Sequence, residues 1–219
     1  MTYNEKIKEA ALGLEMCGIV PVIVINDKKN AAGAAYSLLE GGIGAIEITM
    51  RTPAALSAMA EISKDVPEIT LIAGTVLTPE DADRAFDNGC RAMVSPGLGR
   101  RNVEHAIAKG YPIIPGVATP TEIEAALEYG LEYLKFFPAE TLGGVSALKA
   151  LSAPYAPRGV KFMPTGGVDF RNAASYLALP TVFACGSSKI ATASMIENGD
   201  FDAIMNNAKT AFGISHPTL

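Results

Sequence analysis

Lys135 is the side chain in this sequence that most directly suggests carbonyl chemistry. It lies in the stretch "EYLKFFP", preceded by Tyr133 and Leu134 and followed by two phenylalanines. Lysine is seldom buried without a partner, so the ordinary interpretation is an apolar stem that carries a solvated ammonium. Aromatic surroundings, however, disfavour the charged form, and a neutral lysine is the nucleophile that forms a Schiff base with a ketone. We therefore interpret Lys135 as a candidate nucleophile.

A candidate acid and base lies in the stretch "AIEITMRT". Side chains alternate along a strand, so Glu47, Thr49 and Arg51 are predicted to share one face while apolar residues occupy the other. A carboxylate on an inward face costs several kcal/mol unless it is paired. One interpretation is a Glu47–Arg51 ion pair that merely closes a strand. The alternative is that the two charges, roughly 13 Å apart along an extended strand, contact different parts of a ligand.

Two glycine-containing segments near the end of the chain are candidates for binding an anion. They are "PTGGV", with Gly166 and Gly167, and "CGSS", with Gly186 and Ser187. Glycine lets backbone N–H groups approach an anion closely, and the start of a following helix adds its dipole. Plain turn chemistry also explains such residues. Their occurrence in two successive units favours a phosphate site.

These residues belong to a regular alternation of apolar segments and amphipathic helical segments. The predicted strands are 18–25, 45–50, 70–76, 92–97, 112–118, 133–138, 161–168 and 182–188. Eight such units predict an α/β fold, a (β/α)8 TIM barrel whose active site lies at the carboxyl ends of the strands. We expect one domain over residues 1–219, with an extra N-terminal helix at about 3–16. A doubly wound open sheet is the rival, but no GxGxxG motif follows the first strand.

Composition narrows the classes of function. The net charge is −5 with no basic run, which argues against nucleic-acid or anionic-membrane partners. The odd number of widely spaced cysteines predicts reduced thiols in a cytoplasmic protein, and no signal peptide or membrane span is expected. The two histidines are isolated, so neither a metal nor another cofactor is expected.

Seven motifs together resemble a known family. "EITMRT", "AGTVLTPED", "SPGL", "IPGVATPTE", "LKFFPAE", "GGVSALKAL" and "PTGG" occur in the order and spacing of the class I 2-keto-3-deoxy-6-phosphogluconate aldolases, which also act as 4-hydroxy-2-oxoglutarate aldolases. The resemblance extends from about residue 15 to about residue 212. It implies a barrel, a homotrimer and a metal-independent reaction.

The resemblance also implies roles for individual residues. Lys135 is expected to form the Schiff base, and Glu47 to act as general acid and base. The expected substrate-binding residues are Arg51, which binds the pyruvyl carboxylate, and Thr75, Pro96, Phe137 and Thr165; the expected phosphate-binding residues are Gly166, Gly167, Gly186 and Ser187. One departure stands out. The family's eighth strand commonly ends Gly-Gly-Ser-Trp, whereas this one reads Cys185-Gly186-Ser187-Ser188 before Lys189, and the chain has no tryptophan.

The reaction that the resemblance implies is cleavage of a 2-keto-3-deoxy-6-phospho sugar acid to pyruvate and glyceraldehyde 3-phosphate, a step of the Entner–Doudoroff pathway. Cleavage of 4-hydroxy-2-oxoglutarate to pyruvate and glyoxylate is a related expectation. Three alternatives stay open: an aldolase specific for the galactonate epimer, a phosphate-binding isomerase or epimerase with Glu47 as base, and a non-catalytic sensor of a phosphorylated metabolite.

Overall fold

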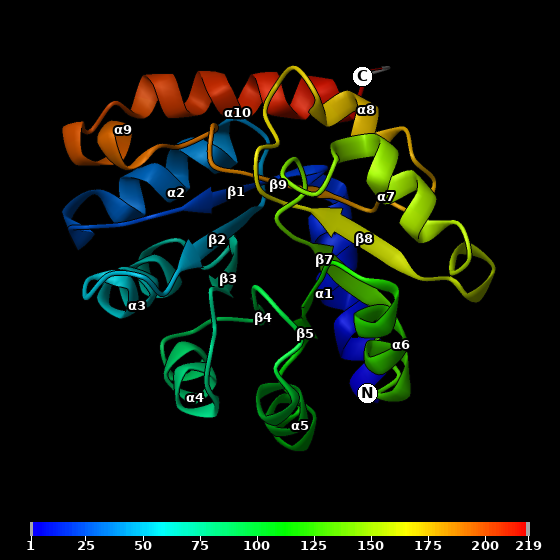
Figure 1. The fold of residues 1–219 in the computed structure, drawn as a ribbon. Helices are drawn as coiled ribbons and strands as arrows, with labels where there is room; N and C mark the ends of the chain where they lie inside the picture. The colour runs from blue at the N-terminus through cyan, green and yellow to red at the C-terminus, as the bar shows by residue number, and fades with distance from the viewer. Residues whose placement is uncertain (1, 218–219) are drawn as a thin grey trace.

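The computed structural model describes residues 2–217, and it confirms the predicted alternation of parallel strands and helices (Figure 1). The strands are β1 (Ile19–Ile23), β2 (Ala45–Thr49), β3 (Thr70–Gly74), β4 (Ala92–Val94), β5 (Ile113–Ile114), β6 (Gly116–Val117), β7 (Tyr133–Phe136), β8 (Lys161–Pro164) and β9 (Cys185–Ser187). The longer helices are α1 (Tyr3–Cys17), α2 (Ala31–Glu40), α3 (Ala55–Asp65), α4 (Pro79–Asp87), α5 (Arg100–Lys109), α6 (Pro120–Glu128), α7 (Gly144–Ser152) and α10 (Phe201–Ser215). Shorter helical turns are η1 (Lys28–Asn30), η2 (Ala156–Arg158), α8 (Ala173–Leu177) and α9 (Ala193–Asn198).

The strands form a curled parallel sheet with helices arranged around it (Figure 1). Six strands pair in the order β5-β4-β3-β2-β1-β9, and three pair in the order β6-β7-β8. Strands β5 and β6 are two parts of the predicted strand 112–118, interrupted at Pro115, which has no N–H to donate to a ladder. The Pro115 carbonyl still accepts a hydrogen bond of 2.8 Å from the Lys135 N–H. Parallel bridges at 162–182 and 165–186 connect β8 to the β9 segment.

Most strands are shorter than predicted, and they end early at their carboxyl ends. The strand predicted at 70–76 ends at Gly74, and the one predicted at 161–168 ends at Pro164. Positive φ angles follow in both cases, 59° at Thr75 and 98° at Gly166, so the backbone leaves the extended conformation there. The residues that end the strands are therefore turn residues at the edge where the candidate site residues lie.

The helices begin where the sequence supplies capping residues. Thr78 and Thr119 each form a capping box with a carboxylate three residues later, and each is followed by proline at the first helical position. Helix α5 ends at Lys109 and is followed by Gly110, which takes the left-handed conformation that glycine tolerates best. Within residues 2–217, no helix is both long enough and apolar enough to cross a membrane.

Candidate active site

Lys135 and Glu47 form a buried ion pair. Lys135 lies on β7 and is 5% exposed, while Glu47 lies on β2 and is 1% exposed. The Lys135 Nζ is 3.3 Å from the Glu47 Oε1 and donates a hydrogen bond to it. The same Nζ lies 5.5 Å from the centre of the Phe137 ring, within cation–π range. Each charge thus offsets the desolvation of the other, and the structure brings the candidate nucleophile and the candidate base into direct contact.

Glu47 keeps one oxygen atom free for other partners. Its Oε2 is buried and has no hydrogen-bond partner among the described residues. A Cβ atom at Gly74 would lie 2.3 Å from the Glu47 Oε1, so only glycine leaves room for this carboxylate. No role is predicted for Gly74 from the sequence. A glycine inside a strand pattern was the available signal, because it often marks a close approach of another group.

The predicted polar face of β2 does not extend to Arg51. The strand ends at Thr49, whose hydroxyl donates to the Ile23 carbonyl over 3.0 Å. The Arg51 N–H then donates to the Thr49 carbonyl over 2.8 Å in a tight turn, and the Arg51 side chain is exposed. The extended spacing predicted between Glu47 and Arg51 is therefore wrong, and within residues 2–217 the two do not form an ion pair.

Thr75 and Pro96 lie at neighbouring strand ends beside this pair. Thr75 follows Gly74 directly, and its φ of 59° is unusual for a β-branched residue, a strain that tends to occur at functional sites. A Cβ atom at Gly116 would lie 2.2 Å from the Pro96 carbonyl oxygen. Gly116 is also the residue paired with Lys135 in the β6–β7 ladder. Pro96 is thereby brought against the strand next to the lysine.

The two glycine segments lie side by side at the ends of β8 and β9. Thr165 and Gly186 are bridge partners, and a Cβ atom at Gly186 would lie 2.4 Å from the Thr165 Oγ1. Gly166 and Gly167 follow with φ values of 98° and 84°. The buried Ser187 hydroxyl donates to the Val168 carbonyl over 2.7 Å, so it fastens one segment to the other.

One sequence expectation about these segments is wrong. The helices after them do not start directly at the glycines, because α8 begins at Ala173 and α9 at Ala193, and they contain only five and six residues. Any anion at this place is therefore bound by loop N–H groups rather than by a helix end. Since Lys135 pairs with Met163 in the β7–β8 ladder, the Gly166–Gly167 segment lies one strand away from the amine at the same carboxyl edge, and the Gly186–Ser187 segment lies one strand further.

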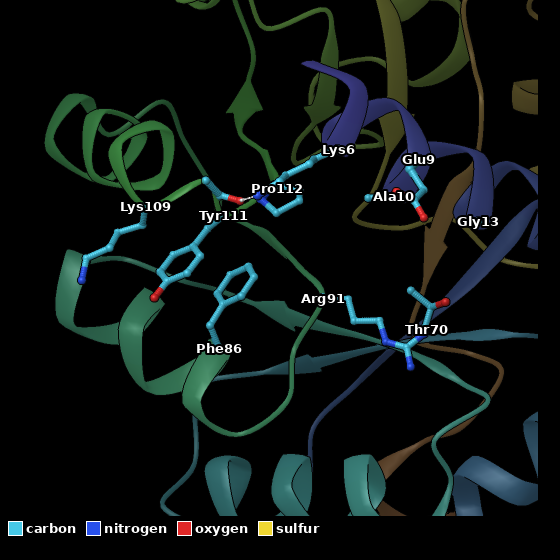
Figure 2. Close-up of a pocket in the computed structure, with 11 residues that line it drawn as sticks. Lys6, Glu9, Ala10, Gly13, Thr70, Phe86, Arg91, Lys109, Tyr111 and Pro112 are labelled. Atoms are coloured by element: carbon cyan, nitrogen blue, oxygen red, sulfur yellow. Dashed lines mark hydrogen bonds between the residues drawn. The ribbon is translucent and has the colours of Figure 1, made fainter. Parts of the chain in front are cut away.

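A cavity of about 620 Å³ lies at the opposite end of the strands, between α1 and the loops that lead into β3, β4 and β5 (Figure 2). Its cations are already engaged: Lys6 and Arg91 donate to backbone carbonyls over 3.3 and 2.9 Å, and Lys109 lies 3.8 Å from a carboxylate. Phe86 and Tyr111 stack on each other with ring centres 3.8 Å apart. This cavity includes neither Lys135 nor Glu47, so it is separate from the candidate chemistry.

The three cysteine thiols are not activated as nucleophiles. Burial raises the pKa of the Cys90 thiol to about 12, and it also raises the pKa of Cys17 and of Cys185. A thiol of raised pKa is a poor nucleophile, because the thiolate is the reactive form. Across residues 2–217, no group of three or more His, Cys, Asp or Glu side chains is arranged to hold a metal ion.

The fold and the site define a parallel α/β protein that holds a buried lysine–carboxylate pair beside glycine loops at the carboxyl ends of its strands. The chain belongs to the KDPG and KHG aldolase family, whose pattern matches residues 11–207, and the resemblance noted in the sequence is confirmed. The 2-dehydro-3-deoxy-phosphogluconate aldolase of Treponema pallidum is 44% identical over 191 residues, which cover 87% of this chain and 90% of that protein.

Solved structures of similar proteins agree with this assignment. The 2-keto-3-deoxy-6-phosphogluconate aldolase of Zymomonas mobilis, determined with 3-phosphoglycerate, superposes with a TM-score of 0.89 at 36% identity and covers 95% of this chain and 97% of that one. The KDPG aldolase of Legionella pneumophila, with pyruvate captured as a covalent carbinolamine, has a TM-score of 0.88 at 35% identity and covers 92% of this chain and 97% of that one.

Proposed function

We propose that this chain is a metal-independent class I aldolase, a carbon–carbon lyase that cleaves a 2-keto-3-deoxy-6-phospho sugar acid to pyruvate and glyceraldehyde 3-phosphate. The observation that carries the proposal is the buried contact of 3.3 Å between the Lys135 amine and the Glu47 carboxylate. The relatives described above support it, because their names specify this reaction and one of them holds pyruvate covalently.

The first half of the reaction forms the electron sink. Glu47 accepts a proton from the Lys135 ammonium, and the neutral amine adds to the C2 ketone to give a carbinolamine. Glu47 then returns the proton to the carbinolamine hydroxyl, which leaves as water, so that a protonated imine forms and Glu47 is again a carboxylate. Because both side chains are buried, this exchange of a proton takes place away from bulk water.

The second half breaks the bond and releases the products. The Glu47 carboxylate removes the proton of the C4 hydroxyl, the C3–C4 bond breaks, and its electron pair passes into the imine to leave an enamine and an aldehyde. Glu47 returns the proton to C3, and one water molecule hydrolyses the imine to free pyruvate and the amine. The free Oε2 gives Glu47 an acceptor that the lysine does not occupy.

Substrate binding is divided between two places at the carboxyl edge. Arg51, exposed in the turn after β2, binds the pyruvyl carboxylate, and Thr75 and Pro96 line the pyruvate pocket. Phe137 and Thr165 are further substrate-binding residues. The phosphate is bound at Gly166, Gly167, Gly186 and Ser187, and the backbone supplies the donors because the Ser187 hydroxyl is engaged. An isomerase with Glu47 as base needs no lysine in contact with that carboxylate, so the pair favours the aldolase.

The proposal extends to architecture and context. In this proposal the two sheets form one complete (β/α)8 barrel, in a single domain over residues 1–219. Two features support it: only Pro115 separates β5 in one sheet from β6 in the other, and bridges connect β8 in one sheet to the β9 segment in the other. The protein works as a cytoplasmic homotrimer on small-molecule substrates, in the Entner–Doudoroff pathway.

Trapping with borohydride tests the proposal directly. Reduction in the presence of pyruvate is expected to add to Lys135 the mass of pyruvic acid less one oxygen atom, as located by peptide mass spectrometry. Lys161, whose Nζ donates to a backbone carbonyl over 2.7 Å, is an internal control and should stay unmodified. No adduct on Lys135, or full cleavage activity in Lys135→Met, would overturn the proposal.

A further inference from the structure

A pair of side chains outside the reaction centre, Glu140 and Tyr176, contacts the glycine loop after β8. Glu140 lies four residues beyond the end of β7, and Tyr176 lies on α8. The Tyr176 side chain is fully buried, and its hydroxyl donates to the Glu140 Oε1 over 2.5 Å. Burial, followed by this hydrogen bond to Glu140, raises the pKa of Tyr176, so the hydroxyl stays protonated as a donor.

Glu140 supports the glycine loop through both its backbone and its side chain. Its N–H donates to the Gly166 carbonyl over 3.0 Å. A Cβ atom at Gly167 would lie 2.5 Å from the Glu140 Cγ, so the stem of Glu140 packs directly against that glycine. Because Gly166 and Gly167 have positive φ and no side chains of their own, their N–H directions depend on such neighbours.

The charge of Glu140 makes its orientation important. A carboxylate that turned toward the glycine loop would repel an anion bound there. Tyr176 holds the Oε1 atom from the side of α8, which follows the same loop along the chain. The hydrogen bond therefore fixes the stem against Gly167 and keeps the negative charge directed toward the tyrosine.

We propose that Glu140 and Tyr176 form a positioning pair that holds the glycine loop in its anion-binding shape and directs the Glu140 charge away from the bound phosphate. The inference rests on the proposed phosphate site. In this proposal, the selectivity for phosphorylated over unphosphorylated substrates depends on two residues outside the reaction centre. Since Glu140 follows β7, the same segment links the loop to the strand of Lys135.

Steady-state kinetics with two substrates test this pair. Tyr176→Phe is expected to raise KM for 2-keto-3-deoxy-6-phosphogluconate about tenfold, the equivalent of one lost hydrogen bond to a charged group. KM for 4-hydroxy-2-oxoglutarate should change by less than about twofold, because that substrate carries no phosphate. Glu140→Gln retains an acceptor for the tyrosine and removes the charge, so KM for the phosphorylated substrate should not rise. Glu140→Ala, which loses the stem, should behave like Tyr176→Phe.

The control is Tyr36→Phe. It removes a hydroxyl on α2 that donates to the backbone carbonyl of Asp65 at the end of α3, and neither helix carries the glycine loops. An equal rise of both KM values in Tyr176→Phe, or no change in either, would overturn the proposal. Calorimetric titration with inorganic phosphate provides a readout without turnover, and Tyr176→Phe should weaken phosphate binding by a similar factor.

A wild-type protein that binds phosphate but forms no pyruvate adduct would refute the aldolase reaction and leave the pair intact. A protein that traps pyruvate without binding phosphate would refute the pair alone.

Discussion

Replacing Lys135 with methionine is predicted to destabilise the protein strongly, in addition to removing the proposed nucleophile. Methionine is similar to the lysine stem in volume, so packing is largely retained. The change leaves the Glu47 carboxylate as an unpaired buried charge, because it is 1% exposed and its Oε2 has no hydrogen-bond partner among residues 2–217. Removal of one member of a buried pair costs about 3–5 kcal/mol. For a chain of this size, the loss corresponds to a fall of about 6–20 °C in Tm.

A double variant separates the effect of the unpaired charge on stability from the effect of altered packing. Lys135→Met combined with Glu47→Gln removes the unpaired charge, and it is expected to recover much of the lost stability. Glu47→Gln alone leaves a buried ammonium that can still donate to an amide oxygen, so its cost should be smaller. Urea unfolding followed by far-UV circular dichroism is the assay, since the chain has no tryptophan to report by fluorescence. The midpoint should shift while the slope stays constant.

Two results would refute this reasoning. A loss below about 1 kcal/mol in Lys135→Met would show that the pair contributes no more than an exposed ion pair. A double variant no more stable than Lys135→Met would show that the loss comes from packing and not from the unpaired carboxylate.

Three further predictions concern other parts of the molecule. Gly186→Ala should cost about 1–3 kcal/mol in the free energy of unfolding, because the new Cβ would lie 2.4 Å from the Thr165 Oγ1. Cys90 should react slowly with iodoacetamide at neutral pH, since burial raises its pKa to about 12, and should react rapidly in urea. Asp169→Asn should lower stability at neutral pH, because the hydrogen bonds from Arg171 lower the pKa of Asp169 below 3.8; the difference from wild type should shrink as the pH falls through that lowered value.

Each of these predictions has its own check. Gly97→Ala is the control for Gly186→Ala, because nothing lies within 4 Å of the Cβ position at Gly97 and its φ is not positive. A change in the free energy of unfolding beyond about 0.5 kcal/mol in Gly97→Ala would weaken the argument that the contact with Thr165 causes the cost in Gly186→Ala. Equal rates of Cys90 labelling with and without urea would contradict burial of the thiol. A stability difference in Asp169→Asn that stays constant down to the lowest pH would show that the charge plays no part.

The alternation of strands and helices could be predicted from the sequence because parallel strands covered on both sides are continuous apolar runs. Strand β2 illustrates this, since all five of its residues are buried, including Glu47. Lys135 and Glu47 could each be singled out, because a charge in an apolar run needs an explanation. Their direct contact could not be predicted, because it depends on how β2 and β7 face each other across the curled sheet.

The turn at Arg51 could not be predicted from alternation, which assumes that a strand continues. The backbone turns after Thr49, and the Arg51 N–H bonds back to the Thr49 carbonyl, so the side-chain period of two is lost at that point. The contact of Glu140 with Tyr176 was missed for a related reason. The residues are 36 positions apart, and neither has a periodic or compositional signal that joins them.

The separation of Lys135 and Glu47 along the chain has a consequence for protein synthesis. The two residues are 88 positions apart and on different strands, so the amine meets the carboxylate that we propose as its proton acceptor only after β2 and β7 have both joined the sheet. In a nascent or unfolded chain, Lys135 is an ordinary solvated ammonium, which does not attack carbonyl compounds. Under the proposed mechanism, the chain therefore acquires its reactivity toward ketones only when these two strands have joined the sheet.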